Sequence, residues 1–455
     1  MARSSRRHVA KTVVEGRAVN INHPATSAVN RNGLPLRLHG LDTLRGLAAV
    51  LVVLLHAGIP YMVCPLSHLV WPARDGCPCR IVDGIVWGIE CFIMPLFFML
   101  TGFLSAGLVA SSGARLFLAH RTQRILWPLL AAFVVILPPC FYIWALGWIA
   151  DGVCVPRGIV RLGIPPELRS QMYGMTHLWF LQYLYIYCIV LCAAWYIRSR
   201  MGFGDRTRAW SARMASRCDR FLASRWKPLL PAVPCGLILY WDPRIVVGFY
   251  QGFLPVASKL LYYAVFFSTG VLLYRARHAL QLQVRNSKVL LALAALVFAF
   301  LLPLIHQQLT GGLTGVERSI LAGLLSLYAS LATFGLFGAF VLTRRGYNSL
   351  TRYLAEASYW IYLIHLPFVV LAQIAVARLA VPTPFKFALS VLAAMTLALL
   401  TYQSFVRYTW VGAALNGCRR QRPGTSPARE VGVPDVVSLP APAVLTAAGR
   451  CRDAA

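Results

Sequence analysis

The sequence predicts an all-α polytopic membrane protein with about ten transmembrane helices and both termini in the cytoplasm. Three observations predict this class: an apolar composition, a series of apolar runs of helical length, and basic residues gathered in alternate connections. Of the 455 residues, 58% are hydrophobic and 13% are charged, and the mean hydropathy is +0.63, which lies outside the usage of soluble domains. The net charge of +29 is therefore interpreted as a topology signal and not as a sign of nucleic-acid binding.

Each predicted span is an apolar run of a length suited to a hydrocarbon layer about 30 Å thick. The runs lie at about 44–63, 82–104, 124–147, 177–197, 228–241, 257–274, 288–305, 319–342, 354–379 and 385–406. The fifth run is short and contains Pro228, Pro231 and Pro234, so a re-entrant segment there would change the parity of every later span.

Lysine and arginine residues test that count, because cytoplasmic loops are enriched in them. The N-terminal arm and the even-numbered connections are strongly basic, above all the loop after the fourth run. The odd-numbered connections are poorer in basic residues or balanced in charge, as where Arg74 and Arg80 accompany Asp75 and Asp83. This alternation across all ten runs favours a fifth run that does cross, and it predicts that both termini are cytoplasmic.

The membrane domain is expected to cover residues 39–416, between two disordered flanks. Residues 1–38 form a basic cytoplasmic arm, and residues 417–455, rich in Pro, Ala and Arg, form a cytoplasmic tail without periodicity. No secretory signal peptide is evident, because the first apolar run starts beyond residue 40 and is too long. The first helix is therefore expected to act as its own insertion signal for the plasma (inner) membrane.

The first span carries the two most unusual side chains, Arg45 and His56. Ionisable groups within a span are costly and need a reason. Eleven residues advance a helix by about 1100°, so the two side chains share one face and lie about 16 Å apart along the axis. Pro60 lacks the N–H that would pair with the His56 carbonyl, which predicts a kink or a polar cavity beside this histidine.

For each of these residues a structural role competes with a chemical one. Asp42 stands at an N-cap position, and Arg45 could simply extend to the cytoplasmic interface. A neutral imidazole at the depth of His56 could instead accept a proton from a hydroxyl and return it to a leaving group. A structural histidine that bridges two helices is the alternative.

Further polar side chains occur at or near other spans. Glu90 lies near the outer end of the second span and is expected either to orient His56 or a substrate hydroxyl, or to face water. Arg121 and Arg124 share a helix face at the cytoplasmic surface, where arginines suit phosphate oxygens but also follow from topology alone. His177 and Trp179 open the fourth span from the outer side, and His365 lies within the ninth, seven residues after Ser358.

The first outward loop contains Cys64, Cys77 and Cys79. An oxidising compartment would permit a disulfide between Cys64 and either of the other two, with the pairing undetermined. A metal site that also uses His68 is disfavoured, because this spacing is not a strong zinc pattern. We therefore predict no metal and either a disulfide or free thiols.

Several segments together resemble the membrane acyltransferases called acyltransferase family 3. In that family an arginine and a histidine eleven residues apart in the first helix form the signature, matched here by Arg45 and His56. Four further motifs resemble, in order, the glucan biosynthesis protein C branch, which is implicated in succinylating periplasmic glucans: Met94-Pro95-Leu96-Phe97-Phe98 with Thr101-Gly102-Phe103, His177-Leu178-Trp179-Phe180-Leu181, Tyr359-Trp360-Ile361-Tyr362-Leu363-Ile364-His365 and Val406-Arg407-Tyr408-Thr409-Trp410-Val411-Gly412. Glu90 and Ile93 stand where that branch usually has a histidine and an arginine, so the acceptor or the acyl group is expected to differ.

The resemblance implies roles for the polar residues. His56 would be the catalytic base, Arg45 would position the acyl donor, and Arg121 with Arg124 would bind the phosphates of an acyl-coenzyme A from the cytoplasm. The predicted activity is O-acylation of a hydroxyl on a periplasmic or cell-surface glycan with a group such as succinyl or acetyl, without a permanently bound cofactor. The competing hypothesis is a transporter or exporter of a polar lipid or glycan that uses intramembrane histidines, and the oligomeric state is open.

Overall fold

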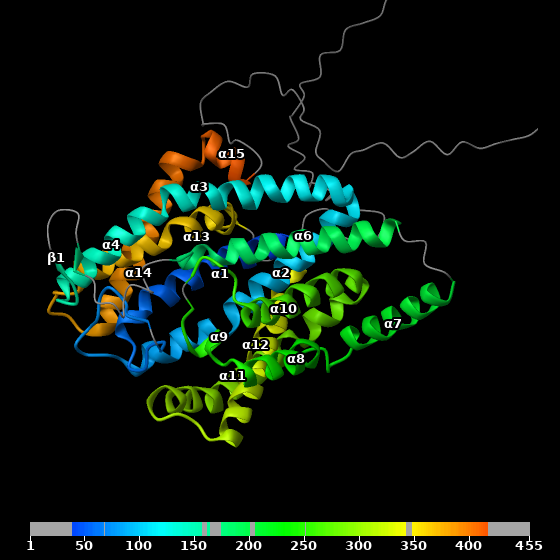
Figure 1. The fold of residues 1–455 in the computed structure, drawn as a ribbon, viewed down its shortest axis with the longest axis horizontal. Coiled ribbons are helices and arrows are strands. Elements are labelled where there is room, and N and C mark those ends of the chain that lie inside the picture. The colour runs from blue at the N-terminus through cyan, green and yellow to red at the C-terminus, as the bar shows by residue number, and fades with distance from the viewer. Residues whose placement is uncertain are drawn as a thin grey trace, which may run out of the picture. The chain divides into compact units, whose positions relative to one another are not determined.

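The computed structural model describes residues 39–67, 69–156, 162–163, 174–200, 205–250, 252–342 and 348–416. Within these residues the chain is helical except for one short antiparallel pair, β1 (Val155–Pro156) and β2 (Leu162–Gly163), and loops. The predicted basic arm and C-terminal tail lie outside the described residues. The protein is an all-α polytopic membrane protein, as its composition predicts (Figure 1).

The described residues contain eight helical stretches long and apolar enough to cross a membrane, at 39–61, 80–135, 176–200, 257–275, 280–310, 315–341, 349–376 and 383–406, and two shorter apolar helices. The helices are α1 (His39–Gly58), α2 (Arg80–Arg121), α3 (Trp127–Val135), α4 (Leu137–Ala150), α6 (Trp179–Arg200), α7 (Asp205–Ala223), α8 (Leu229–Trp241), α9 (Arg244–Val247), α10 (Ala257–Arg275), α11 (Leu280–Thr310), α12 (Gly315–Val341), α13 (Ser349–Val376), α14 (Thr383–Thr401) and α15 (Trp410–Asn416). Short 3-10 turns span Ile59–Tyr61, Thr176–Leu178 and Arg277–Ala279, and wider π turns span Thr122–Leu126 and Tyr402–Val406.

The third predicted span begins earlier than the sequence indicates. The chain turns back at Gly113, whose φ of 78° and ψ of 167° lie outside the helical region and are open mainly to glycine. Helical structure then continues through α3 and α4 to Ala150, and α4 packs against α13 (Figure 1). The apolar pattern missed this start because residues 114–123 are largely polar or small, whereas the turn is set by one backbone conformation.

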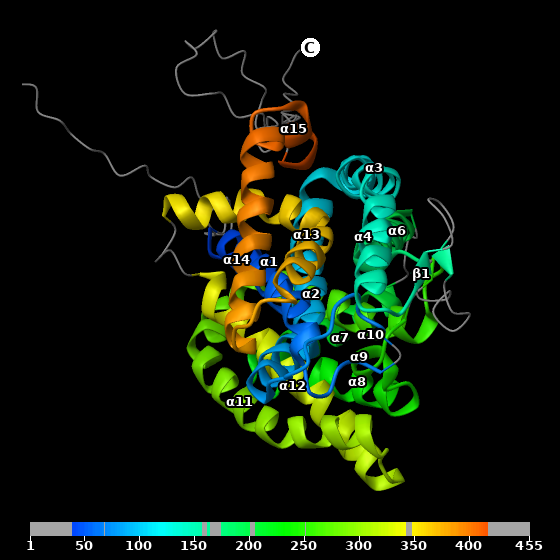
Figure 2. The same ribbon diagram turned by 90° about the vertical axis from the view of Figure 1, so that its left-hand side faces the viewer.

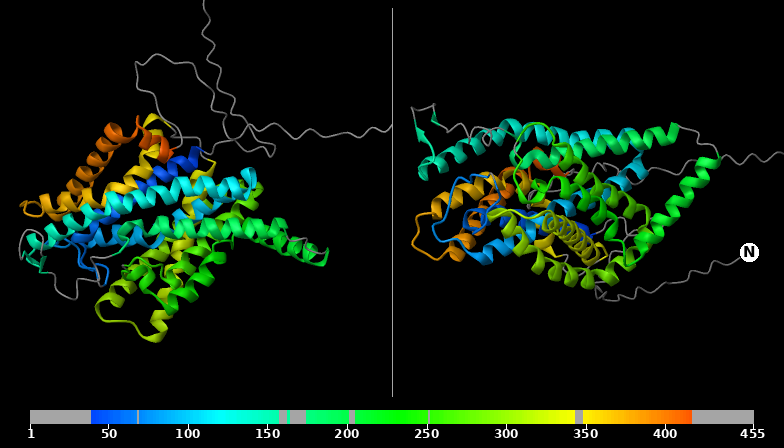
Figure 3. Two further views of the ribbon diagram at one scale, coloured as in Figure 1. Left: turned by 45° about the horizontal axis from the view of Figure 1, so that its top comes forward. Right: turned by 60° about the horizontal axis from the view of Figure 1, so that its bottom comes forward.

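The short fifth run forms α8, which lies antiparallel to α10. At one end Asp242 accepts a hydrogen bond from Ser258 Oγ at 2.5 Å, and midway Cys235 Sγ lies 3.7 Å from the Tyr262 carbonyl oxygen. At the other end α7 lies at the edge of the bundle and contacts α10 through Asp219 and Arg275, whose charged groups are 3.7 Å apart (Figure 3). Helix α8 therefore runs antiparallel to the first part of α10, and with 13 residues it is one of the shorter apolar helices and not one of the eight long enough to cross a membrane.

The helices that carry the candidate residues pack closely around α1. Helix α13 packs against both α1 and α14, and these helices stand beside α2 in Figure 2. Helices α2 and α10 approach most closely at Gly102 and Gly270. A Cβ atom at Gly102 would lie 2.1 Å from the Phe267 carbonyl oxygen, and one at Gly270 would lie 2.0 Å from that of Met99. Only hydrogen fits at either position, so this pair fixes the spacing of the two helices.

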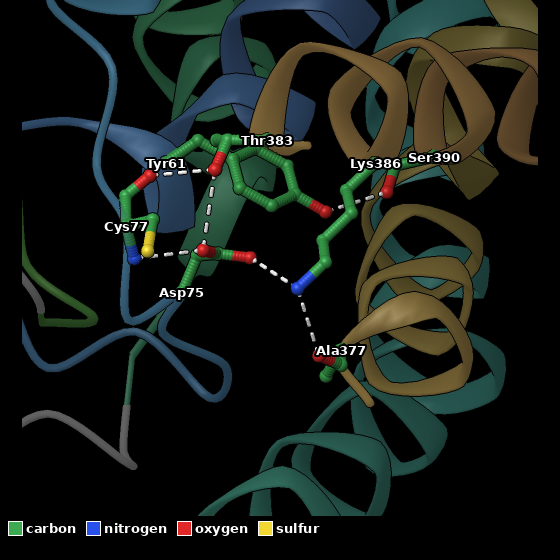
Figure 4. Close-up of polar contacts among 7 residues, drawn as sticks. All are labelled: Tyr61, Asp75, Cys77, Ala377, Thr383, Lys386 and Ser390. Atoms are coloured by element: carbon green, nitrogen blue, oxygen red, sulfur yellow. Dashed lines mark hydrogen bonds and ion pairs between the residues drawn. The ribbon is translucent and has the colours of Figure 1, made fainter. Parts of the chain in front are cut away.

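The loop at residues 62–79 marks one end of the bundle, here called the loop end, and it is fastened to α14. Lys386 Nζ donates to Asp75 Oδ2 at 2.8 Å and to the Ala377 carbonyl at 3.1 Å (Figure 4). Thr383 Oγ1 donates to the Cys77 carbonyl at 2.5 Å, and Tyr61 OH lies 3.0 Å from Ser390 Oγ. These contacts hold the loop against the end of α14.

The ionised form of Asp75 is the one that this clamp stabilises. Burial alone would raise the pKa of Asp75, but hydrogen bonds from Lys386, the Cys77 N–H and Thr383, with the Lys386 charge, outweigh it and hold the pKa below its ordinary value. A depressed pKa adds stability at pH values above the unfolded-state pKa, and that stability is lost as the pH falls through the folded pKa.

We expect the stability difference between the wild type and Asp75→Asn to be constant near neutral pH and to shrink as the pH falls below about 4. Thermal unfolding in detergent over a pH series measures it. Asp151→Asn is the control. Burial raises the pKa of Asp151, so the pH dependence of its stability difference should have the opposite sign. A difference for Asp75→Asn that stays constant below pH 4 would contradict the assignment.

Candidate functional site

Three histidines that are far apart in the sequence meet inside the helical bundle. His56 comes from α1, His177 from the turn before α6, and His365 from α13. The ring centroids of His56 and His365 are 4.9 Å apart, and those of His177 and His365 are 5.1 Å apart. His365 is fully buried between the other two.

Backbone carbonyl groups fix which ring nitrogen of each histidine carries hydrogen. His56 Nδ1 lies 2.9 Å from the Val52 carbonyl oxygen, which only accepts, so Nδ1 is the donor in the neutral ring. His56 Nε2 then bears the lone pair that can accept a proton. His365 Nδ1 donates likewise to the Tyr362 carbonyl at 2.8 Å, and His177 Nε2 donates to the Leu363 carbonyl at 2.9 Å.

A cavity of about 130 Å³ reaches the cluster from the loop end. Its wall includes His56, His177, Glu90 and Trp179, so four of the residues selected from the sequence share one space. Aromatic rings make up much of the rest, namely Trp71, Phe141, Trp144, Phe249, Tyr250 and Tyr263. We call this space the loop-end cavity. His56 is therefore not enclosed by apolar neighbours alone.

Lys259 is the charged residue of this cavity that the sequence argument missed. Its side chain is buried, at 8% exposure, with Nζ 3.6 Å from the centroid of the Trp179 ring. Glu90 also lines the cavity, so a basic side chain from α10 and an acidic one from α2 share this space. Lys259 stands in the first turn of α10, where a sequence pattern indicates an ordinary interfacial lysine. The tertiary packing turns it inward.

A second cavity, of about 290 Å³, lies at the opposite end of α1 and is called the arginine-end cavity. Arg45, Arg121 and Arg124 line it together with His120. Arg45 Nη1 lies 3.6 Å from Asp42 Oδ1, so Asp42 contacts the arginine that it precedes by one helical turn. Three of the four basic groups were selected from the sequence, and the fold brings them to one space.

The arginines of this cavity are held by neighbouring polar groups. Arg121 Nη2 donates to Ser105 Oγ at 3.2 Å, and Arg124 Nη1 donates to the Leu415 carbonyl at 2.9 Å. Tyr359 OH donates to the Arg124 carbonyl at 2.9 Å. Such contacts reduce the freedom of the guanidinium groups and leave their charge facing the cavity.

The two cavities are separated by a thin wall of side chains at the histidine cluster. Tyr362 lines the arginine-end cavity, and its hydroxyl group donates to the carbonyl of His177, which lines the loop-end cavity, at 2.7 Å. Phe180 lines the arginine-end cavity and packs on Tyr362, with ring centroids 5.7 Å apart. One helix, α1, thus presents Arg45 to one space and His56 to the other.

Gln373 resolves the problem that Pro60 creates. Its side-chain Nε2 donates to the carbonyl groups of His56 at 3.0 Å and Ala57 at 3.1 Å, which are left without helical partners at the end of α1. Its Oε1 accepts from Trp71 Nε1 at 2.7 Å. The orphaned carbonyl was evident from the sequence, but the partner lies more than 300 residues further along the chain.

The three cysteines of the first loop are separate thiols in this structure. Cys64, Cys77 and Cys79 are all free, so neither predicted disulfide pairing is formed. His68, the other candidate of the disfavoured metal site, lies outside the described residues. Cys64 instead faces Asp83 and His306.

The protein is thus a helical membrane protein with a histidine cluster between two cavities that ionisable side chains help to line. A family model described as an acyltransferase domain matches residues 38–403, most of the chain. The chain belongs to this family, acyltransferase family 3, and is a membrane acyltransferase that transfers groups other than aminoacyl groups. Searches of curated proteins and of solved structures give no match.

Proposed function

We propose that this protein is an O-acyltransferase that moves an acyl group from a cytoplasmic acyl-coenzyme A to a hydroxyl group of a carbohydrate on the opposite side of the membrane. The observation that carries the proposal is the placement of His56 in the loop-end cavity, beside the wall that separates it from the arginine-end cavity. A base at that wall can reach an acyl acceptor bound in the loop-end cavity and an acyl donor that extends from the arginine-end cavity.

The arginine-end cavity suits the donor. Coenzyme A carries several phosphate groups, and arginine pairs with phosphate through short charge-assisted hydrogen bonds. Arg45, Arg121 and Arg124 supply three guanidinium groups at one space, at the end of the bundle that the distribution of basic residues predicts to be cytoplasmic. The acyl end of the donor would extend past Tyr362 toward His56.

The loop-end cavity suits a carbohydrate acceptor. Aromatic rings such as Trp71, Trp144 and Trp179 offer flat apolar surfaces for the C–H faces of a sugar, and Glu90 and Lys259 offer an acceptor and a donor for its hydroxyl groups. Glu90 replaces the histidine usual in the glucan branch, and it lies in this cavity. This difference from the glucan branch therefore lies where the acceptor or the acyl group would be selected. Succinyl and acetyl groups both remain candidates for the acyl group.

The chemistry follows from the tautomer of His56. Its Nε2 removes the proton of the acceptor hydroxyl group as the hydroxyl oxygen attacks the thioester carbonyl carbon. The C–S bond breaks, the coenzyme thiolate leaves, and the imidazolium returns the proton to the sulfur. An ester and free coenzyme A result, and no permanently bound cofactor is required. The cell inner membrane is the compartment that fits both substrates.

Replacing Arg121 and Arg124 together with alanine is expected to raise the KM for the acyl donor by more than tenfold, with a smaller change in the KM for the acceptor. Loss of two phosphate contacts, at about 1.5 kcal/mol or more each, accounts for the change. Steady-state kinetics of the purified protein in nanodiscs measure both constants. Arg115→Ala is the control, because Arg115 is exposed nearby and does not line the cavity. An unchanged donor constant would remove these arginines from the site.

The reaction itself is tested with the same preparation. Radiolabelled acyl-coenzyme A and a glycan extract are supplied, and mass spectrometry of the product identifies the acyl group and the acceptor fragment. Acyl transfer to the glycan supports the proposal. Movement of a glycan or lipid across the bilayer without acylation would contradict it.

A further inference from the structure

A cluster of three different potential metal ligands lies at the loop end, outside both cavities. Cys64 belongs to the loop at residues 62–79, Asp83 to the first turn of α2, and His306 to the last turns of α11. One ligand atom from each lies within 4.8 Å of the other two. None of the three is among the residues that line the loop-end or arginine-end cavity.

Hydrogen bonds hold the Asp83 carboxylate in a fixed position beside Cys64. Its side chain is fully buried, and Oδ1 accepts from the Val63 N–H at 2.9 Å and from the Cys64 N–H at 3.3 Å. Trp87, one turn further along α2, donates from Nε1 to the Cys64 carbonyl at 3.1 Å. The backbone of Cys64 is therefore held from both sides, and its thiol lies within 4.8 Å of the carboxylate.

His306 completes the cluster with a nitrogen that lacks a hydrogen bond. Its Nε2 is buried and lies 3.3 Å from Asp83 Oδ2, yet the two atoms do not form a hydrogen bond of acceptable geometry. A buried ring nitrogen without a hydrogen bond carries a desolvation cost. A cation bonded to both atoms would remove that cost.

We propose that Cys64, Asp83 and His306 bind a zinc ion. Thiolate sulfur, imidazole nitrogen and carboxylate oxygen are the ligands that zinc accepts, and bonds of about 2.0–2.3 Å place tetrahedral ligands roughly 3–4 Å apart. The observed cluster needs only a small contraction to reach this geometry. The charges of the thiolate and the carboxylate balance the two positive charges of zinc, and the fourth position is left for water.

Zinc at this site would join three segments at the loop end: the loop at residues 62–79, α2 and α11. The loop at residues 62–79 carries Leu66, Leu69 and Trp71, which line the loop-end cavity. Its other side is already clamped to α14 through Asp75 and Lys386. A metal ion between Cys64, α2 and α11 would fasten the near side of the same loop and so fix the wall of the cavity.

The experiment measures metal content and does not require acyl transfer. Full-length protein in nanodiscs is stripped with a chelator and titrated with zinc against a chromophoric competitor. We expect one zinc ion per chain in the wild type and at least a tenfold loss of affinity in Cys64→Ser and in His306→Ala. Cys77→Ser, in the same loop, and His278→Ala, an exposed histidine outside the cluster, are matched controls that keep wild-type affinity.

Cobalt provides an independent readout of the sulfur ligand. Cobalt bound to the wild type should show a thiolate-to-metal charge-transfer band that Cys64→Ser lacks and Cys77→Ser retains. Absence of zinc binding in the wild type would leave only an Asp83–His306 ion pair and would overturn the proposal. Equal zinc affinity in the wild type and Cys64→Ser would overturn it as well, whatever the outcome of the acyl-transfer assay.

Discussion

Replacing His56 with alanine is expected to lower the rate of acyl transfer by about 10²- to 10⁴-fold, the usual contribution of a positioned general base. The other histidine that lines the loop-end cavity has both ring nitrogens engaged: His177 Nε2 donates to the Leu363 carbonyl, and His177 Nδ1 lies 3.2 Å from the Thr176 hydroxyl oxygen. The turnover rate should therefore fall while the KM for the donor, bound at the arginine-end cavity, changes little. Assays in nanodiscs with saturating donor measure this loss.

The control for this substitution makes the same change at a histidine outside the site. His278→Ala, at the exposed turn before α11, should retain wild-type activity. Size-exclusion chromatography in detergent establishes that His56→Ala is folded. A folded His56→Ala protein with full transfer activity would show that the imidazole is not the base, and the assignment of the reaction centre would be wrong.

Gly270→Ala and Gly102→Ala should each destabilise the protein strongly. The added methyl group would lie about 2 Å from a carbonyl oxygen of the facing helix, whereas ordinary contacts start near 3.4 Å, so α2 and α10 would have to separate by more than an ångström. Insertion into a packed interface costs about 1–3 kcal/mol, and a clash with rigid backbone belongs at the upper end of that range. Because α2 carries Glu90 and α10 carries Lys259, the separation would also disturb the loop-end cavity.

Thermal unfolding in detergent, followed by the yield of monodisperse protein, measures the effect. Gly323→Ala on α12 is the matched control, because no atom lies within 4 Å of a Cβ placed there. In a helix interior alanine is favoured over glycine by up to about 1 kcal/mol, so this variant should be as stable as the wild type or slightly more so. Stabilities of Gly270→Ala and Gly323→Ala that do not differ would contradict the close approach seen between α2 and α10.

The helical class and most of the spans could be predicted because a lipid environment leaves the backbone little choice. Every N–H and C=O group within the hydrocarbon layer must be paired inside the segment, so an apolar run becomes a helix whatever its neighbours are. The relation between Arg45 and His56 is likewise local, since eleven residues of helix determine their common face and their separation. These features depend on the chain only over short distances, so local sequence is enough to predict them.

The packing of the helices determines which of these side chains meet. His365 lies between His56 and His177 because α1, α6 and α13 pack together, and no spacing along the chain encodes that contact. Lys259 and Gln373 became visible only when packing turned them toward Trp179 and toward the end of α1. Such contacts join residues up to hundreds of positions apart, and they follow from the fit of whole helix surfaces, which a pattern of apolar residues does not specify.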